Sequence, residues 1–197
     1  MDLSLPALLS LVRDTIANPR GAARAIIDLR LPAQVGWTAL ALMAVAATLA
    51  SYVSLKLSPP EAQAMFGKAM ESPLRTAFLQ LFVLVAGCFA LWRIGRARGG
   101  QGSLEDSVAL IAWLQFVLLV LQAVMMAVQL LVPPLGGLIG LGELVLFFWL
   151  LVNFVAELHG FRSLAATFAG VLLTLLVLVF MISLILIAVI GPAALGA

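Results

Sequence analysis

The sequence predicts an all-α, polytopic membrane protein with five transmembrane helices, preceded by one or two amphipathic surface helices. Three observations lead to this fold class. Hydrophobic residues make up 64% of the 197 and charged residues only 10%, whereas a soluble domain carries about 25% charged residues. Five apolar runs are each long enough to cross the bilayer, since a hydrocarbon core of about 30 Å takes about 20 helical residues. Most basic residues stand in short segments between these runs.

The first 31 residues are predicted to form two short amphipathic helices. Residues 3–17 place leucines and other apolar side chains on one helical face, and residues 20–30 oppose apolar side chains to arginines. The pair Asn18-Pro19 separates them, because the residue before a proline disfavours the helical conformation. Such helices either lie along the membrane surface or pack on the ends of the spans, and the sequence leaves both possibilities open.

The membrane domain is predicted over residues 32–197, after a cytoplasmic segment over 1–31. Its first span contains small residues four apart, for example Ala46, Ala50 and Ser54, a spacing that lets two helix backbones approach closely. The predicted spans cover residues 33–55, 73–94, 104–130, 138–158 and 164–190, with a short helix over 61–70 after the first span, and with Pro133-Pro134 and Gly191-Pro192 ending the third and fifth spans.

A glycine-rich turn, residues 99–102, leads into the third span. It does not follow a predicted strand, so it does not fit a nucleotide-binding loop, and we interpret it as a flexible hinge. Ser103 is expected to cap the helix that follows, and the two acids after it suit the positive end of the helix dipole. The glycines of this loop that we single out are Gly99, Gly100 and Gly102.

The distribution of charge predicts the orientation in the membrane. Eight of the 11 basic residues fall in segments on one side of the predicted spans. Cytoplasmic loops are enriched in Lys and Arg, so the N-terminus is expected in the cytoplasm and the C-terminus on the opposite side. The eight residues are Arg13, Arg20, Arg24, Arg30, Arg93, Arg96, Arg98 and Arg162.

Polar side chains within the spans are candidates for function, because they are costly in hydrocarbon. Gln115, Gln122 and Gln129 recur every seven residues on the third span. At 3.6 residues per turn they share one face. That face is suited either to hydrogen bonds between helices or to the wall of a polar path.

The fourth span carries Glu143, Asn153 and Glu157 on broadly one side. Near the outer end, Glu143 is interpreted as a buried, protonated acid or as a proton- or cation-binding site. At the cytoplasmic end, Glu157 is expected to pair with a loop arginine. The following loop contains His159, expected to cap the end of its own helix, and Arg162.

Little in the sequence indicates reaction chemistry. His159 is the only histidine and Cys88 the only cysteine, so metal sites built from several His or Cys ligands are excluded, and no metal or cofactor is expected. There is no nucleophile paired with a base, and we predict a protein that is not an enzyme. The basic residues lie in short loops between apolar runs, so nucleic acid is not expected as a partner.

Two stretches resemble the Yip (Ypt-interacting protein) family of five-span membrane proteins: residues 99–106 (GGQGSLED) and residues 157–165 (ELHGFRSLA). Asn18-Pro19 is also similar to an element of bacterial members. The resemblance implies a cytoplasmic N-terminus, an external C-terminus and no known enzymatic activity. Eukaryotic relatives bind small GTPases and act in vesicle traffic and membrane shaping, but their long acidic N-terminal domain is missing here. The Ala/Leu/Arg-rich composition indicates a bacterial member in the inner (cytoplasmic) membrane, with a periplasmic C-terminus.

Two functions are compatible with this reading. The first is a non-enzymatic scaffold, or an accessory component of a membrane complex or of membrane organisation. Such a protein is expected to contact membrane lipids and either a membrane-protein partner or a second copy of itself. The alternative is a small transporter or channel that uses Glu143 and the face of Gln115, Gln122 and Gln129.

Overall fold

The computed structural model describes residues 5–58, 60–67, 70–131 and 136–190. Every regular element in these ranges is a helix, which confirms the predicted all-α class, and five of the helices are long and apolar enough to cross a membrane. In chain order the helices are α1 (Leu5–Ala17), α2 (Pro19–Asp28), α3 (Ala33–Leu57), α4 (Pro60–Phe66), α5 (Pro73–Ala97), α6 (Leu104–Leu131), α7 (Gly136–His159) and α8 (Leu164–Ile190).

The helix boundaries agree closely with the sequence prediction. The start of α3, α5, α6 and α8 falls on the predicted residue, while α3 and α5 run two or three residues further than expected. Helix α4 ends at Phe66, four residues early, where Gly67 follows and glycine is a poor helix former. The ends predicted at Pro133-Pro134 and Gly191-Pro192 lie outside the described residues.

The break between α1 and α2 forms as the sequence predicts. Helix α1 ends at Ala17, and Pro19 occupies the first position of α2, where its missing N–H has no partner to lose. Asn18 caps α2, because its side-chain oxygen accepts a hydrogen bond from the Gly21 N–H at 3.0 Å.

The glycine turn after α5 is a hydrogen-bonded helix ending, and its predicted role as a flexible hinge stays a prediction. Gly99 has φ +85°, a conformation that glycine adopts without a Cβ clash. The Gly100 N–H donates to the Gly95 carbonyl at 2.9 Å and the Gly99 N–H to the Arg96 carbonyl at 3.0 Å. These two bonds make a Schellman motif. The predicted cap of α6 is present, since Ser103 Oγ accepts from the backbone N–H of the first turn at 3.0 Å.

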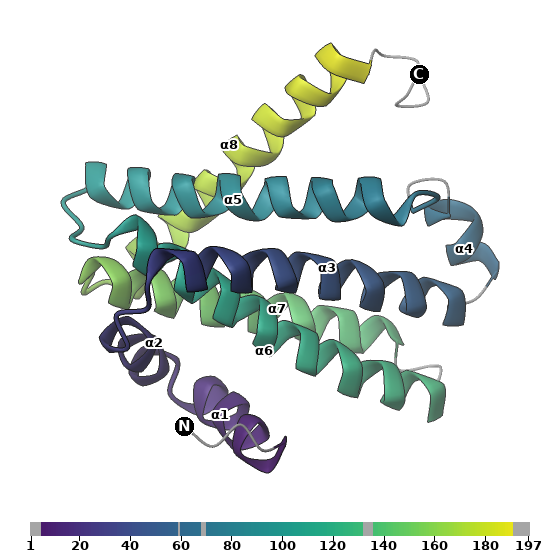
Figure 1. The fold of residues 1–197 in the computed structure, drawn as a ribbon, viewed down its shortest axis with the longest axis horizontal. Coiled ribbons are helices and arrows are strands. Elements are labelled where there is room, and N and C mark those ends of the chain that lie inside the picture. The colour runs from purple at the N-terminus through teal and green to yellow at the C-terminus, as the bar shows by residue number, and fades with distance from the viewer. Residues whose placement is uncertain (1–4, 59, 68–69, 132–135, 191–197) are drawn as a thin grey trace.

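Helix α3 packs chiefly on α6 and α5, α8 packs on α7 and α5, and α2 lies across α7 and α6 (Figure 1). Gly36 brings α3 close to α6, because a Cβ there would lie 3.3 Å from the Val108 side chain. The expected small-residue face, Ala46, Ala50 and Ser54, is only half-buried. The buried residues of α3 recur every four positions: Gly36, Leu40, Ala44 and Thr48.

The core is concentrated in one half of the bundle. From Leu150 to His159, every residue of α7 except Glu157 is buried, whereas Leu141, Leu144 and Val145 near the other end of the helix are exposed. Helix α7 contacts helices on several sides, namely α2, α5, α6 and α8. The same half contains the start of α6, where most residues between Ser107 and Val117 are buried.

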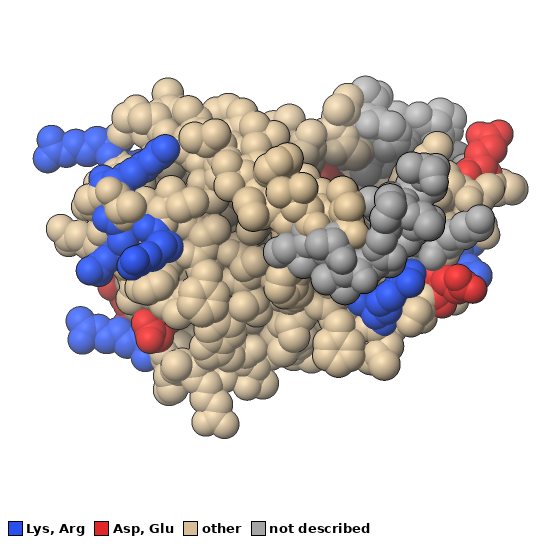
Figure 2. Space-filling model, turned by 90° about the horizontal axis from the view of Figure 1, so that it is seen from above, with Lys and Arg blue, Asp and Glu red and all other residues tan. Residues whose placement is uncertain are grey.

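Lys and Arg side chains gather at one end of the molecule, and a smaller mixed group of basic and acidic side chains lies at the opposite end (Figure 2). The first group comes from α2, the turn between α5 and α6, and the turn between α7 and α8, which meet at the same end of the bundle (Figure 1). We call this the arginine-rich end. It lies next to the buried half of α7.

Candidate functional site

The buried end of α7 is the centre of the candidate site, because three segments far apart in the sequence meet there. Helix α2 packs along α7, the turn after α5 lies against His159, and the chain leaves α7 at Gly160. Gly160 has φ +70° and follows a second Schellman ending, in which the Phe161 N–H donates to the Ala156 carbonyl at 2.8 Å. These segments contain the stretches that resemble the Yip family.

His159 is the last residue of α7 and is 3% exposed. Its Nε2 donates a hydrogen bond to the Leu91 carbonyl of α5 at 3.2 Å, since that carbonyl can only accept. The ring stacks on Phe161, with centroids 5.4 Å apart and planes 27° from parallel. The expected capping of its own helix is therefore wrong, because the imidazole bonds to a neighbouring helix and fixes α7 to α5.

Three glycines make room for the His159 ring. A Cβ on Gly95 or on Gly100 would overlap the ring, and a Cβ on Gly102 would lie 2.6 Å from the Leu158 side chain and 3.0 Å from His159 Cε1. We refer to His159, Leu91, Phe161 and these three glycines as the His159 cluster. The loop glycines Gly100 and Gly102 belong to it, whereas Gly99 shapes the turn.

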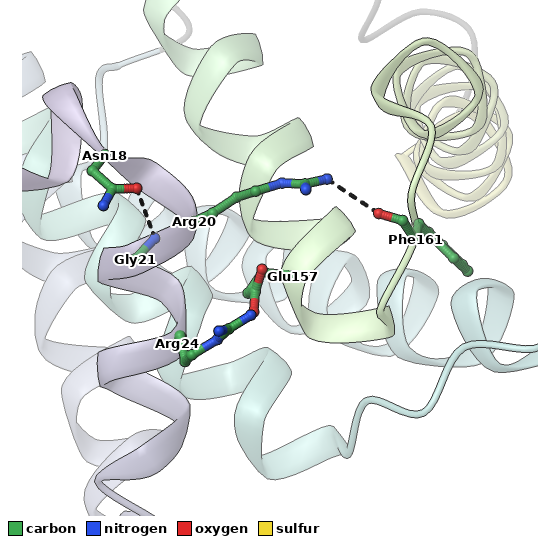
Figure 3. A network of polar contacts seen from close by, with 6 residues as sticks. All are labelled: Asn18, Arg20, Gly21, Arg24, Glu157 and Phe161. Atoms are coloured by element: carbon green, nitrogen blue, oxygen red, sulfur yellow. Dashed lines mark hydrogen bonds and ion pairs between the residues drawn. The ribbon is translucent and has the colours of Figure 1, made fainter.

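Glu157 forms an ion pair, as expected, but its partner is in α2. Its Oε1 accepts from Arg24 Nε at 2.7 Å and also from Arg24 Nη2 (Figure 3). The predicted pairing with a loop arginine is thus replaced by a contact that fastens α2 to α7. The neighbouring Arg20 adds a second tie, because its Nη2 donates to the Phe161 carbonyl at 3.1 Å (Figure 3).

Two indole groups hold the N-terminal helices further along the spans. Trp113 Nε1 of α6 donates to Thr15 Oγ1 at 3.2 Å, and Trp149 Nε1 of α7 donates to the Ile16 carbonyl at 3.5 Å. Ala23 of α2 is fully buried. Helices α1 and α2 therefore pack on the spans, and their position along the membrane surface stays a prediction.

The remaining candidates on α7 do not form one site. Asn153 is buried, and its Nδ2 donates to the Trp149 carbonyl one turn back at 2.8 Å. Glu143 is fourteen residues from Glu157, which at 1.5 Å per residue corresponds to about 21 Å along the helix. The intramembrane acid is therefore far from the His159 cluster.

Glu143 instead lies near the glutamine face of α6. Glu143 and Gln122 line the same cavity of about 380 Å³, together with Leu118 and Gly140. Gln122 and Gln115 are half-buried, whereas the side chain of Gln129 lies outside the described residues. The structure thus brings one member of the predicted glutamine face to the predicted acid.

In the described ranges, no group of three or more His, Cys, Asp and Glu side chains is placed to hold a metal ion. Arg162 is exposed in the turn after α7 and lines a cavity between α5 and α8. Sequence reasoning missed Gly95, which comes directly after the predicted second span (residues 73–94) and has no neighbour in the sequence that marks it.

A family model described as the Yip1 domain matches residues 13–185, a range that contains all the contacts described above. No curated protein and no solved structure matches the chain.

Proposed function

Because the chain belongs to the Yip1 domain family and is a multi-pass membrane protein, we propose that it acts as a non-enzymatic scaffold, or as an accessory component of a membrane complex. We further propose that it resides in a bacterial inner membrane, with the arginine-rich end on the cytoplasmic side. The excess of arginine at that end supports this orientation.

The observation that carries the scaffold role is how α7 uses its polar side chains. Glu157 bonds to Arg24, His159 to the Leu91 carbonyl, and Asn153 to a carbonyl of its own helix. A catalytic or transport site needs polar groups that are free to contact a substrate. Here Glu157 and His159 Nε2 join α7 to neighbouring helices, and they support the end on which α2 and the arginine-containing turns are displayed.

The test is to isolate the full chain from its native membrane in mild detergent after cross-linking, and to identify by mass spectrometry what accompanies it in fixed ratio. We expect one membrane-protein partner or a second copy of the chain. Arg24→Ala should reduce its recovery modestly, because α2 loses its ion pair with α7 but keeps the bond from Arg20 to the Phe161 carbonyl. Arg13→Ala, which removes an exposed arginine from α1, is the matched control. A monomer recovered alone would refute the scaffold role.

One observation favours the transporter or channel as a second candidate: Glu143 and Gln122 line the same cavity. An acid and an amide that face one cavity within the spans are a typical arrangement for an ion or proton site. The test is flux in proteoliposomes of the purified protein. Flux that is lost in Glu143→Gln and kept in Glu157→Gln would favour this candidate over the scaffold, and absence of flux would reject it.

A further inference from the structure

A cavity of about 470 Å³ lies at the arginine-rich end, between α5, α7 and α8. Its volume is within the roughly 300–1,000 Å³ that small-ligand sites enclose. Leu91 and Ile94 line it from α5, Val155 from α7 and Val171 from α8. Most of its wall is apolar, so a molecule that fills it needs an apolar part.

Two threonines on the α8 wall do not alter this character. Thr167 Oγ1 donates to the Ser163 carbonyl at 2.8 Å, and Thr174 Oγ1 donates to the Gly170 carbonyl at 2.7 Å. Each hydroxyl hydrogen is bonded to the helix one turn back. Neither threonine therefore offers a free donor to the cavity.

Two arginines give the cavity a positive edge. Arg98 and Arg162 both line it and are exposed. The Arg98 guanidinium extends from the end of α5 to α8, since a Cβ on Gly170 would overlap its Nη1 atom. Among the described residues the salt bridge is that of Arg24 with Glu157, so no described carboxylate neutralises either arginine at the cavity.

We propose that this cavity binds one anionic glycerophospholipid, with the phosphate between Arg98 and Arg162 and an acyl chain along the apolar wall. Guanidinium groups bind phosphate oxygens in a bidentate manner, and basic pockets between membrane helices take anionic headgroups. Helix α8 begins at Leu164, beside Arg162, and its N-terminal dipole adds positive potential. Free phosphate would leave the apolar part of the cavity unfilled.

The acyl chain has a route to the bilayer. Helix α8 diverges from α5 toward its C-terminal end (Figure 1). On this part of α8, Leu173, Leu176 and Val177 are exposed. An acyl chain that leaves the cavity along α8 therefore continues over exposed apolar side chains. This proposal is independent of the scaffold role, because it concerns the isolated chain and its lipid.

The experiment is native mass spectrometry of the purified full chain in phosphatidylcholine micelles titrated with phosphatidylglycerol. We expect one phosphatidylglycerol to be retained in preference to phosphatidylcholine. Because hydrogen bonds to charged groups are strong, Arg98→Gln combined with Arg162→Gln should weaken retention about tenfold or more. Arg13→Gln combined with Arg30→Gln removes the same charge without touching the cavity, and should leave retention unchanged.

A second pair of variants keeps both arginines and tests the apolar part. Ala166 lines the cavity, whereas Ala169 on the same helix does not, so Ala166→Trp should abolish retention and Ala169→Trp should preserve it. If the double arginine variant does not fold, the comparison of Ala166→Trp with Ala169→Trp tests the proposal by itself. Equal retention in both members of a pair, equal retention of phosphatidylcholine, or displacement of the lipid by millimolar inorganic phosphate would each overturn the proposal.

Discussion

Gly95→Ala offers a direct test of the His159 cluster, because the added Cβ would overlap the imidazole ring. The ring is buried at the junction of two helices and cannot move without losing its hydrogen bond to the Leu91 carbonyl. Helix α5 provides the matched control. A Cβ on Gly87 meets nothing within 4 Å, so Gly87→Ala makes the same chemical change in the same helix without a clash.

The expected difference follows from three contributions. Overpacking costs about 1–3 kcal/mol, and a buried polar group that loses its partner costs about 1–3 kcal/mol. Alanine is favoured over glycine within a helix by about 1 kcal/mol. Gly87→Ala should therefore leave stability unchanged or raise it slightly, whereas Gly95→Ala should lower the free energy of unfolding by about 1–5 kcal/mol.

The assay is thermal unfolding of the purified chain in detergent, followed by tryptophan fluorescence. The double variant Gly95→Ala with His159→Ala should be less destabilised than the sum of the two single variants, because removal of the ring makes room for the new methyl group. If Gly95→Ala unfolds at the temperature of Gly87→Ala, or if the two changes at Gly95 and His159 are additive, the packing described here is wrong.

Three further predictions concern the same end of the bundle. A double-mutant cycle on Arg24 and Glu157 should give a coupling free energy below about 1 kcal/mol. This coupling should become smaller as salt is added, because the Arg24 side chain is 70% exposed. A coupling free energy of several kcal/mol would contradict this prediction. Gly160→Ala should cost about 1–2 kcal/mol in thermal unfolding, owing to φ +70° at this position, and an unchanged midpoint would count against the assigned turn. Trp113→Phe removes the hydrogen bond to Thr15 and should speed limited proteolysis of α1 severalfold. Cleavage between α3 and α5 should not change. If α1 is cleaved at the same rate in Trp113→Phe as in the unchanged protein, the indole does not hold α1.

The spans were predictable because their length is set by the bilayer, and apolar runs of about 20 residues are visible in any sequence. Helix ends were predictable where a local signal exists, as at Asn18 and Ser103, whose side chains cap the helices that follow. In each of these cases the physics acts within a few residues of the chain.

The candidate site was predictable only in part, because its contacts join residues far apart in the sequence. His159 bonds to a carbonyl 68 residues away and Glu157 to an arginine 133 residues away, and neither separation leaves a periodic signal. The residues on either side of Gly95 in the sequence do not distinguish it from a glycine that faces lipid. The choice between a capping and a bridging histidine depends on which helix lies beside it, and this is decided by packing.

The docking of α2 on α7 also sets an order of events during synthesis. Arg24 leaves the ribosome 133 residues before Glu157, and at about 5–20 residues per second this interval is roughly 7–27 s. During that time three spans, α3, α5 and α6, enter the bilayer, while α2 lacks α7 and Arg24 lacks the carboxylate of Glu157. Its arginine-bearing amphipathic form suits the lipid headgroup layer in the meantime. We therefore expect α2 to lie in the surface position that the sequence also allowed until the fourth span is inserted.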